Sequence, residues 1–173
     1  YLYTDRDRER RLRNLRTLYI AATLDYSFLI QGAASLLRLG DRRFLQGLRR
    51  DLERAGFDLS RDEVLSEKTA FGEIVIGGTG DNRYVNLDER GVAILIDLGG
   101  NDFYANRVAA ATRRIRAAVV VDVAGDDAYE SNVDYSQGSG FMGIGILIDG
   151  AGDDSYVGTR MSQGASLLGV GLL

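Results

Sequence analysis

Acidic and amide residues recur in four short turns in the second half of the chain, each after a run of aliphatic residues. Every turn contains two adjacent Asp or Asn residues, and three of the turns have a further Asp five residues before the second of these. Carboxylate and amide oxygens are the ligands that a hard cation such as Ca²⁺ prefers. The pattern therefore predicts Ca²⁺ as a candidate cofactor, with Asn82, Asp102, Asp126, Asp127, Asp153 and Asp154 as the candidate metal-binding residues.

The same residue types also have a purely structural explanation. Asp and Asn side chains hydrogen-bond to their own backbone in tight turns, and Gly adopts the left-handed conformation there. If the turns stack about 4.8 Å apart, each pair of neighbouring like charges repels by about 1 kcal/mol in water. Either full solvation or a bound cation would offset this repulsion. Both the calcium interpretation and the turn interpretation stay open at this point.

The residue inventory excludes most catalytic chemistry. The chain has no Cys and no His, which excludes thiol nucleophiles, disulfides, Cys/His zinc sites and imidazole general bases. A serine hydrolase built on Ser136 or Ser162 would lack a histidine base to activate its nucleophile. We therefore predict no catalytic residue and no organic cofactor.

The turns belong to a repeat that must position them. Each copy has an apolar triplet, an Asp/Gly turn and a final Tyr, and the triplets begin at Ile74, Ile94, Val119 and Ile146, with steps of 20, 25 and 27 residues. A second phrase, Ser136-Gln137-Gly138, returns 26 residues later as Ser162-Gln163-Gly164. Such periods are typical of stacked units that cannot bury their apolar faces alone. Residues 71–173 are predicted to form a parallel, right-handed β-solenoid of about four coils.

Stacking places equivalent residues of successive coils in columns. We predict that one apolar column lies inside the solenoid and that the tyrosines form a stacked ladder, whose function is packing or, alternatively, ligand stacking. The apolar column is Ile76, Ile96, Val121 and Ile148, and the tyrosine column is Tyr84, Tyr104, Tyr129 and Tyr156.

Residues 1–70 follow a different pattern. They contain four of the 22 Gly and carry a net charge of +3, whereas residues 71–173 carry −7. Two apolar stripes at helical spacing predict amphipathic helices with buried faces: Leu12, Leu15, Leu18 and Ala22, and Phe44, Leu48 and Leu52. The chain is thus predicted to be mainly β with an α-helical N-terminal cap over residues 1–70, packed on the open edge of the first coil.

Local signals mark the ends of these helices. Asp41 is a candidate N-cap, and Gly56 is a candidate left-handed terminator. Ser60 and Glu63 have the spacing of a capping box, which predicts a further short helix through Leu65.

The first helix is rich in Arg, but Asp5, Asp7 and Glu9 alternate with the arginines. This interleaving favours a solvated helix with internal ion pairs over a nucleic-acid interface. The apolar stretch over residues 18–39 contains Asp25 and Arg38, so it does not predict a membrane span. We therefore expect no nucleic-acid partner and no transmembrane segment.

The turn sequence Gly77-Gly78-Thr79-Gly80-Asp81-Asn82-Arg83-Tyr84 resembles the nonapeptide of haemolysin-type (RTX) calcium-binding repeats. The resemblance implies a secreted or cell-surface protein and a calcium ligand in the sixth place, at Asn82, Asp102, Asp127 and Asp154. Here, however, one turn occurs per 20 to 27 residues rather than per nine, the first copy has Asn as the ligand, and later copies have Asp for the first Gly. The turns also resemble Gly-Asp-Asp-x-Tyr repeats of uncharacterised bacterial proteins.

Two functions fit these patterns. The first is a non-catalytic structural or adhesive β-solenoid of an exported bacterial protein, stabilised by calcium. The alternative is a β-helix enzyme that cleaves polysaccharide with paired carboxylates, although a catalytic pair should interrupt the repeat at one place. With a step of 26, Leu172 and Leu173 align with Ile146 and Leu147 inside a repeat. We therefore expect the solenoid to be incomplete at its C-terminal end. Either further coils follow there, or another subunit stacks on this end and self-association builds a fibre.

Overall fold

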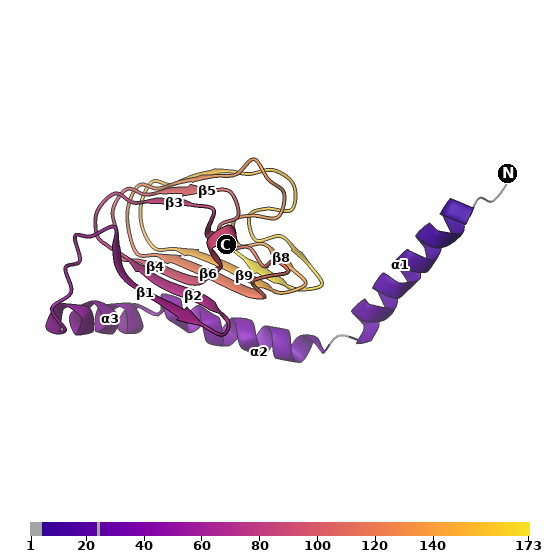
Figure 1. Ribbon diagram of the computed structural model, residues 1–173, viewed down its shortest axis with the longest axis horizontal. Coiled ribbons are helices and arrows are strands. Elements are labelled where there is room, and N and C mark those ends of the chain that lie inside the picture. The colour runs from indigo at the N-terminus through magenta and orange to yellow at the C-terminus, as the bar shows by residue number, and fades with distance from the viewer. Residues whose placement is uncertain (1–4, 24) are drawn as a thin grey trace.

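The computed structural model describes residues 5–23 and 25–173, and it contains a β-solenoid with helices along one side (Figure 1). The helices are α1 (Asp5–Thr23), α2 (Tyr26–Leu36), α3 (Arg42–Arg54) and α4 (Leu87–Arg90), with a 3-10 helix over Leu37–Gly40. The large sheet has the order β1 (Glu63–Thr69), β2 (Gly72–Gly77), β4 (Val92–Asp97), β6 (Ala117–Asp122), β9 (Ile144–Asp149), β12 (Val170–Leu172). A second sheet contains β3 (Arg83–Val85), β5 (Phe103–Ala105), β7 (Ala128–Glu130) and β10 (Ser155–Val157), and a third pairs β8 (Gly140–Phe141) with β11 (Ser166–Leu167).

The predicted parallel β-solenoid is confirmed. The repeated triplets pair in register, so that Ile74, Ile94, Val119 and Ile146 lie side by side in the large sheet. The four tyrosines pair in register in the second sheet. The solenoid makes about three turns rather than the predicted four. Four strand-turn-strand units lie between β2 and β10, and the chain makes one turn in passing from each unit to the next.

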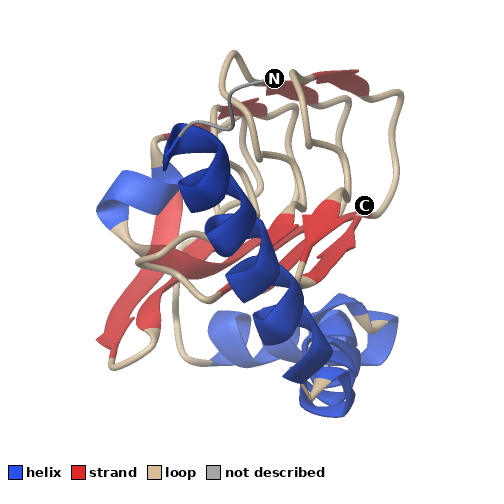
Figure 2. Ribbon diagram, turned by 90° about the vertical axis from the view of Figure 1, so that its right-hand side faces the viewer, coloured by secondary structure: helices blue, strands red, loops and turns tan. Residues whose placement is uncertain are grey.

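The large sheet is covered on both faces, which corrects the predicted inside column. Val75, Leu95, Val120 and Leu147 face the interior and pack with the tyrosines. Ile76, Ile96, Val121 and Ile148 face the opposite way and pack against helical residues such as Ala33 and Leu52. Since parallel strands buried on both faces are apolar throughout, the triplets alone do not indicate which alternate residues point inward. Figure 2 shows helices against the outer face of the larger sheet.

The predicted short helix at Ser60 is wrong. Asp58 accepts hydrogen bonds from the backbone N and the hydroxyl of Ser60, at 3.0 and 2.7 Å, which closes a turn. The chain then forms β1, which pairs antiparallel with β2. This strand, rather than a helix, covers the open edge of the first coil. Pairing with β2 and burial of Val64 stabilise the strand more than the local capping box stabilises a helix.

Helix α3 has the predicted ends, and both α2 and α3 pack on the sheet. Asp41 caps α3 by accepting from the backbone N of Arg43 at 2.7 Å, and Gly56 has a φ of 80° after its last turn. Leu52 is buried and Leu48 is partly buried against the sheet, whereas Phe44 is 43% exposed.

The predicted burial of the first helical stripe is wrong, because α1 has no buried residue. Figure 1 shows this helix extending away from the solenoid. Within the described residues, no single helix is long and apolar enough to cross a membrane. Asp5–Thr23 and Tyr26–Gly40 meet the length and composition requirement only as a pair, and they are bent by 66° relative to each other.

Candidate functional site: a row of buried aspartates and tyrosines

Each coil leaves the large sheet through an Asx turn whose exposed side chain fastens it to the next coil. Oδ1 of Asp81 accepts from the backbone N of Asn101 at 2.8 Å, and Oδ1 of Asn101 accepts from that of Asp126 at 2.9 Å. Oδ1 of Asp126 continues the column by accepting from the backbone N of Asp153 at 3.0 Å. These exposed carboxylates therefore serve the turn, as the structural interpretation of the motif predicts.

The adjacent inner column makes the same kind of bond in the opposite direction. The backbone N of Asn82 donates to Oδ1 of Asp102 at 2.6 Å, and that of Asp102 donates to Oδ1 of Asp127 at 2.6 Å. The backbone N of Asp127 donates to Oδ1 of Asp154 at 2.9 Å. Each turn is thus linked to its neighbour in both directions, which explains why two adjacent Asx residues recur.

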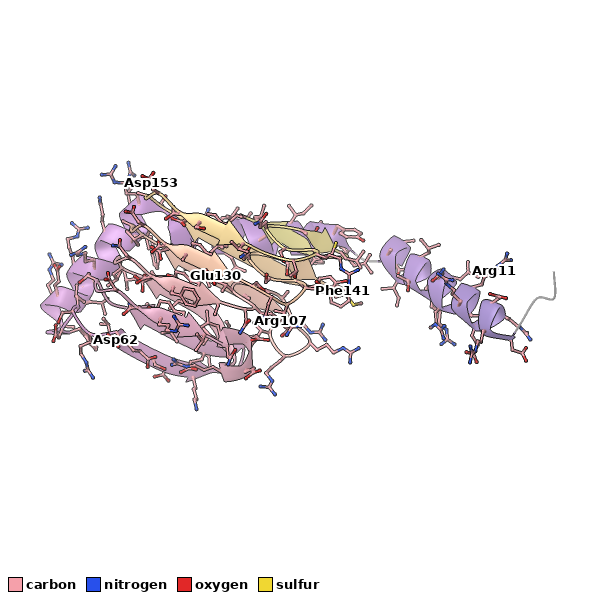
Figure 3. All side chains as sticks on the ribbon, turned by 90° about the horizontal axis from the view of Figure 1, so that it is seen from above. Arg11, Asp62, Arg107, Glu130, Phe141 and Asp153 are labelled. Carbon is pink, nitrogen blue, oxygen red and sulfur yellow. The ribbon has the colours of Figure 1, made fainter. Side chains whose placement is uncertain are left out.

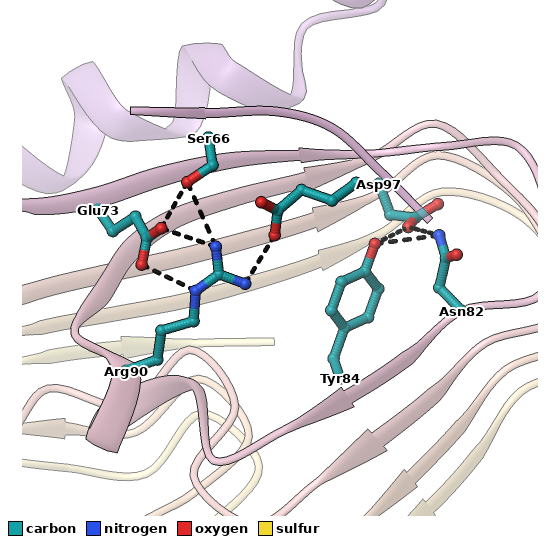
Figure 4. Close-up of polar contacts among 7 residues, drawn as sticks. Ser66, Glu73, Asn82, Tyr84, Arg90 and Asp97 are labelled. Atoms are coloured by element: carbon teal, nitrogen blue, oxygen red, sulfur yellow. Dashed lines mark hydrogen bonds and ion pairs between the residues drawn. The ribbon is translucent and has the colours of Figure 1, made fainter. Parts of the chain in front are cut away.

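A third column connects the turns to the tyrosine ladder. The hydroxyl of Tyr84 donates to Oδ2 of Asp97, which also accepts from Nδ2 of Asn82 at 2.9 Å (Figure 4). One coil on, the hydroxyl of Tyr104 donates to Oδ2 of Asp122 at 2.5 Å. Each of these two tyrosines therefore bonds an aspartate of the following coil, a link that the spacing from each Tyr to the next Asp could have indicated.

The tyrosine ladder is continuous and buried in the middle. Ring centroids lie 5.0, 4.5 and 4.7 Å apart along Tyr84, Tyr104, Tyr129 and Tyr156. Tyr104 and Tyr129 have no exposed surface. The predicted stacking is confirmed, and the two middle rings, Tyr104 and Tyr129, stack on a ring on each side.

The second and third columns form two carboxyl clusters. In each cluster the carboxylate oxygens lie within 4.8 Å of one another, and the members are Asp97, Asp102 and Asp122, and Asp127, Asp149 and Asp154. Of the predicted metal-binding residues, Asp127 and Asp154 are therefore brought together in the second cluster, and Asp102 lies in the first. Asn82 contributes its amide to Asp97, while Asp126 and Asp153 lie outside both clusters.

Burial changes the protonation of these groups. Removal from water raises the pKa of Asp102 to about 7, helped by the neighbouring Asp97 and Asp127 charges. Removal from water likewise raises the pKa of Asp122 to about 8, and it raises the pKa values of Asp97, Asp127 and Asp149. The clusters therefore retain protons at pH values where isolated carboxylates are fully ionised.

Three buried carboxyl oxygens of the clusters have no N–H or O–H donor among the described residues: Oδ2 of Asp102, Oδ2 of Asp127 and Oδ1 of Asp149. Oδ1 of the adjacent Asn82 also lacks a donor. Asp102 lies within hydrogen-bonding reach of Asp97, and Asp127 lies within reach of Asp122. A proton between two carboxyls would satisfy the first two of these oxygens, and so would a cation bound by both.

The opposite corner of the coil contains the second repeated phrase. Nε2 of Gln137 donates to the backbone O of Tyr129 and of Val157, both at 2.9 Å. Oγ of Ser136 lies 3.0 Å from Oγ of Ser162 in the next coil. These side chains hold the corner together, and no candidate base lies among these contacts.

Comparison with known proteins assigns neither a family nor a function to the chain. The chain matches no protein-family model, no curated protein and no solved structure. The similarity of its turns to calcium-binding repeats therefore stays a prediction from the motif.

Proposed function

We propose that this chain is a non-catalytic structural or adhesive β-solenoid of an exported protein. The observation that carries the proposal is that the candidate carboxylates recur from coil to coil and that most of them accept a hydrogen bond from the neighbouring coil: Asp81, Asp97, Asp102, Asp122, Asp126, Asp127 and Asp154. An enzyme needs one place where the repeat is interrupted and substrate can enter. The resemblance of the turns to exported repeats supports a secreted or cell-surface location.

The alternative of a polysaccharide-cleaving enzyme is disfavoured by burial. Asp97 and Asp122 are 0% and 1% exposed, and their Oδ2 atoms already accept tyrosine hydroxyls. A glycosidase requires two carboxyl groups that reach a sugar from opposite sides. Incubation with neutral and acidic polysaccharides should release no reducing ends. Release that is lost in Asp97→Asn would overturn the proposal.

Calcium stabilisation is part of this proposal. The cluster of Asp127, Asp149 and Asp154 fits a hard cation better than the first cluster, because Asp149 and Asp154 are only partly buried and solvent can deliver an ion. Bound Ca²⁺ would supply positive charge that offsets carboxylate repulsion. Oδ2 of Asp127, which is buried and accepts no hydrogen bond from the described residues, would be one of the ligands of this ion.

The test compares thermal unfolding in calcium and in chelator. An ion present at about 100 times its Kd should add about 2.7 kcal/mol to the free energy of unfolding. Asp127→Asn with Asp154→Asn should abolish this gain, since Asn preserves the Oδ1 acceptors but lacks the charge. The matched control is Asp126→Asn with Asp153→Asn, which lies outside the clusters and should respond like the wild type. Equal unfolding in calcium and chelator would refute the calcium proposal alone.

Self-association through the ends of the solenoid is the last part of the proposed function. Among the described residues, β12 and β10 stand at the ends of their sheets, with one edge of each unpaired. Such edges recruit further strands, so we propose that they pair with a second copy of the chain. Light scattering of the chain should show concentration-dependent association, and a monomer at all concentrations would exclude the second copy.

A further inference from the structure

Helix α1 has an apolar stripe with no packing partner among the described residues. Leu12, Leu15, Leu18 and Tyr19 recur at spacings of three and four, which places them on one side of the helix. Their exposed fractions are 52, 61, 64 and 71%. An apolar stripe of this kind is normally covered. The stripe therefore has no cover within the part of the chain that the structure describes.

The rest of α1 is strongly basic. Between residues 5 and 16, six Arg stand against three acidic residues, a net charge of +3. At 100° per residue, Arg13 and Arg10 lie on the side opposite Leu15. Arg13 pairs with Glu9 at 3.6 Å, and both side chains are about 70% exposed. Figure 3 shows Arg11 on α1, far from the acidic solenoid.

The exposed apolar surface continues on α2. This helix packs Ala33 against the sheet, yet Phe28 and Ile30 are 73% and 61% exposed, and Tyr26 is 39% exposed. Since apolar residues surround most of α2, its solvent side also has the composition of a covered surface. Both helices thus present aromatic and aliphatic residues next to an arginine-rich segment.

We propose that α1 and the solvent side of α2 lie on an anionic lipid surface. Leucine and aromatic side chains would enter the boundary between headgroups and acyl chains, while the arginines would bind anionic headgroups. The 66° bend between the two helices suits segments that lie along a surface rather than cross it. The acidic solenoid, with a net charge of −7 over residues 71–173, would be held in solution away from the lipid.

Two other partners, a second copy of the chain and a nucleic acid, fit the exposed surface of α1 less well. The stripe from Leu12 to Ala22 is shorter than the three to four heptads typical of a coiled coil with a second copy. A nucleic acid would be bound by the arginines but would leave the leucines exposed. The lipid surface is the partner that matches both the charge and the apolar stripe.

Co-sedimentation of the full chain with vesicles tests this proposal. The wild type should bind vesicles of phosphatidylcholine with phosphatidylglycerol, and bind pure phosphatidylcholine more weakly. Leu15→Gln with Leu18→Gln should weaken partitioning about thirtyfold or more, because two apolar side chains leave the lipid boundary. Thr17→Gln, on the side opposite Leu15, should change it less than about twofold. Arg10→Gln with Arg13→Gln should reduce binding about tenfold, on anionic vesicles only.

The controls separate the possible partners. The leucine variant should unfold at the wild-type temperature, since α1 has no buried residue. A lower unfolding temperature would overturn the proposal by showing that the stripe packs on protein. Absence of vesicle binding, or equal binding by the leucine variant, would overturn it too. So would a wild-type dimer that the leucine variant dissociates without lipid. None of these outcomes depends on the function proposed for the solenoid.

Discussion

Raising the pH from 5 to 8 should destabilise this fold, and the buried aspartates are the reason. The pKa of Asp102 is about 7 in the folded chain, against a usual value of 3.8, and that of Asp122 is about 8. A carboxyl whose pKa is raised by folding stabilises the native state most below its unfolded pKa. That contribution is lost as the pH rises through the folded pKa, which here means between about 4 and 8.

The magnitude follows from the shift. Each pH unit is worth about 1.4 kcal/mol for each proton that only the folded state retains. The rise at Asp102 spans about three units, an upper figure of about 4 kcal/mol, and screening by solvent and adjacent backbone donors reduces it to about 2 kcal/mol. Asp102→Asn should remove this penalty, since it preserves the Oδ1 acceptor for Asn82. The first coil already has Asn in this column, at Asn82.

The assay is urea unfolding at pH 5, 6, 7 and 8, at constant ionic strength and with chelator present to remove calcium. The wild type should lose stability steadily across this range. Asp102→Asn should show a shallower slope and exceed the wild type at pH 8 by about 2 kcal/mol. A matched control, Asp126→Asn, changes an exposed carboxylate of the outer column and should preserve the wild-type slope. A wild-type profile that is flat or rises with pH would refute the reasoning.

Three further outcomes are expected. Gly125→Ala should prevent stacking or lower the free energy of unfolding by more than ~3 kcal/mol, because a Cβ there would lie 1.6 Å from a backbone oxygen of the preceding coil. The control is Gly47→Ala in α3, whose Cβ would meet nothing within 4 Å and which should stabilise the fold by about 0.5–1 kcal/mol. Thermal unfolding measures both. Tyr104→Phe should cost about 1–2 kcal/mol in chemical unfolding, since Oδ2 of Asp122 loses its donor; an unchanged value would show that the bond is dispensable. The Arg90 guanidinium holds the pKa of Glu73 at about 2, so this carboxylate stabilises the fold above its usual pKa of 4.5, and the effect is lost as the pH falls towards 2. In Glu73→Gln the free energy of unfolding should therefore fall less steeply between pH 4.5 and pH 2. The same slope in the variant and the wild type would contradict this.

The sequence alone was sufficient for the repeat and for several local structures. Periods near 25 with an apolar triplet and an Asx turn specify stacked parallel strands, because each unit can bury its apolar residues only against its neighbours. Asp41 and Gly56 likewise acted as predicted, since capping depends on a few adjacent residues. Short-range interactions of this kind can be predicted where no tertiary contact competes with them, as the pairing of β1 with β2 does after Ser60.

Only the tertiary structure decided which surfaces meet. Whether Ile76 or Val75 points inward depends on helices that cover the outer face, and β1 replaced a predicted helix because an open strand edge was available beside it. The carboxyl cluster joins Asp97, Asp102 and Asp122 from two successive coils, whose distance in space depends on the stacking register. Their raised pKa values arise from burial, and burial is a property of the assembled coils rather than of any segment.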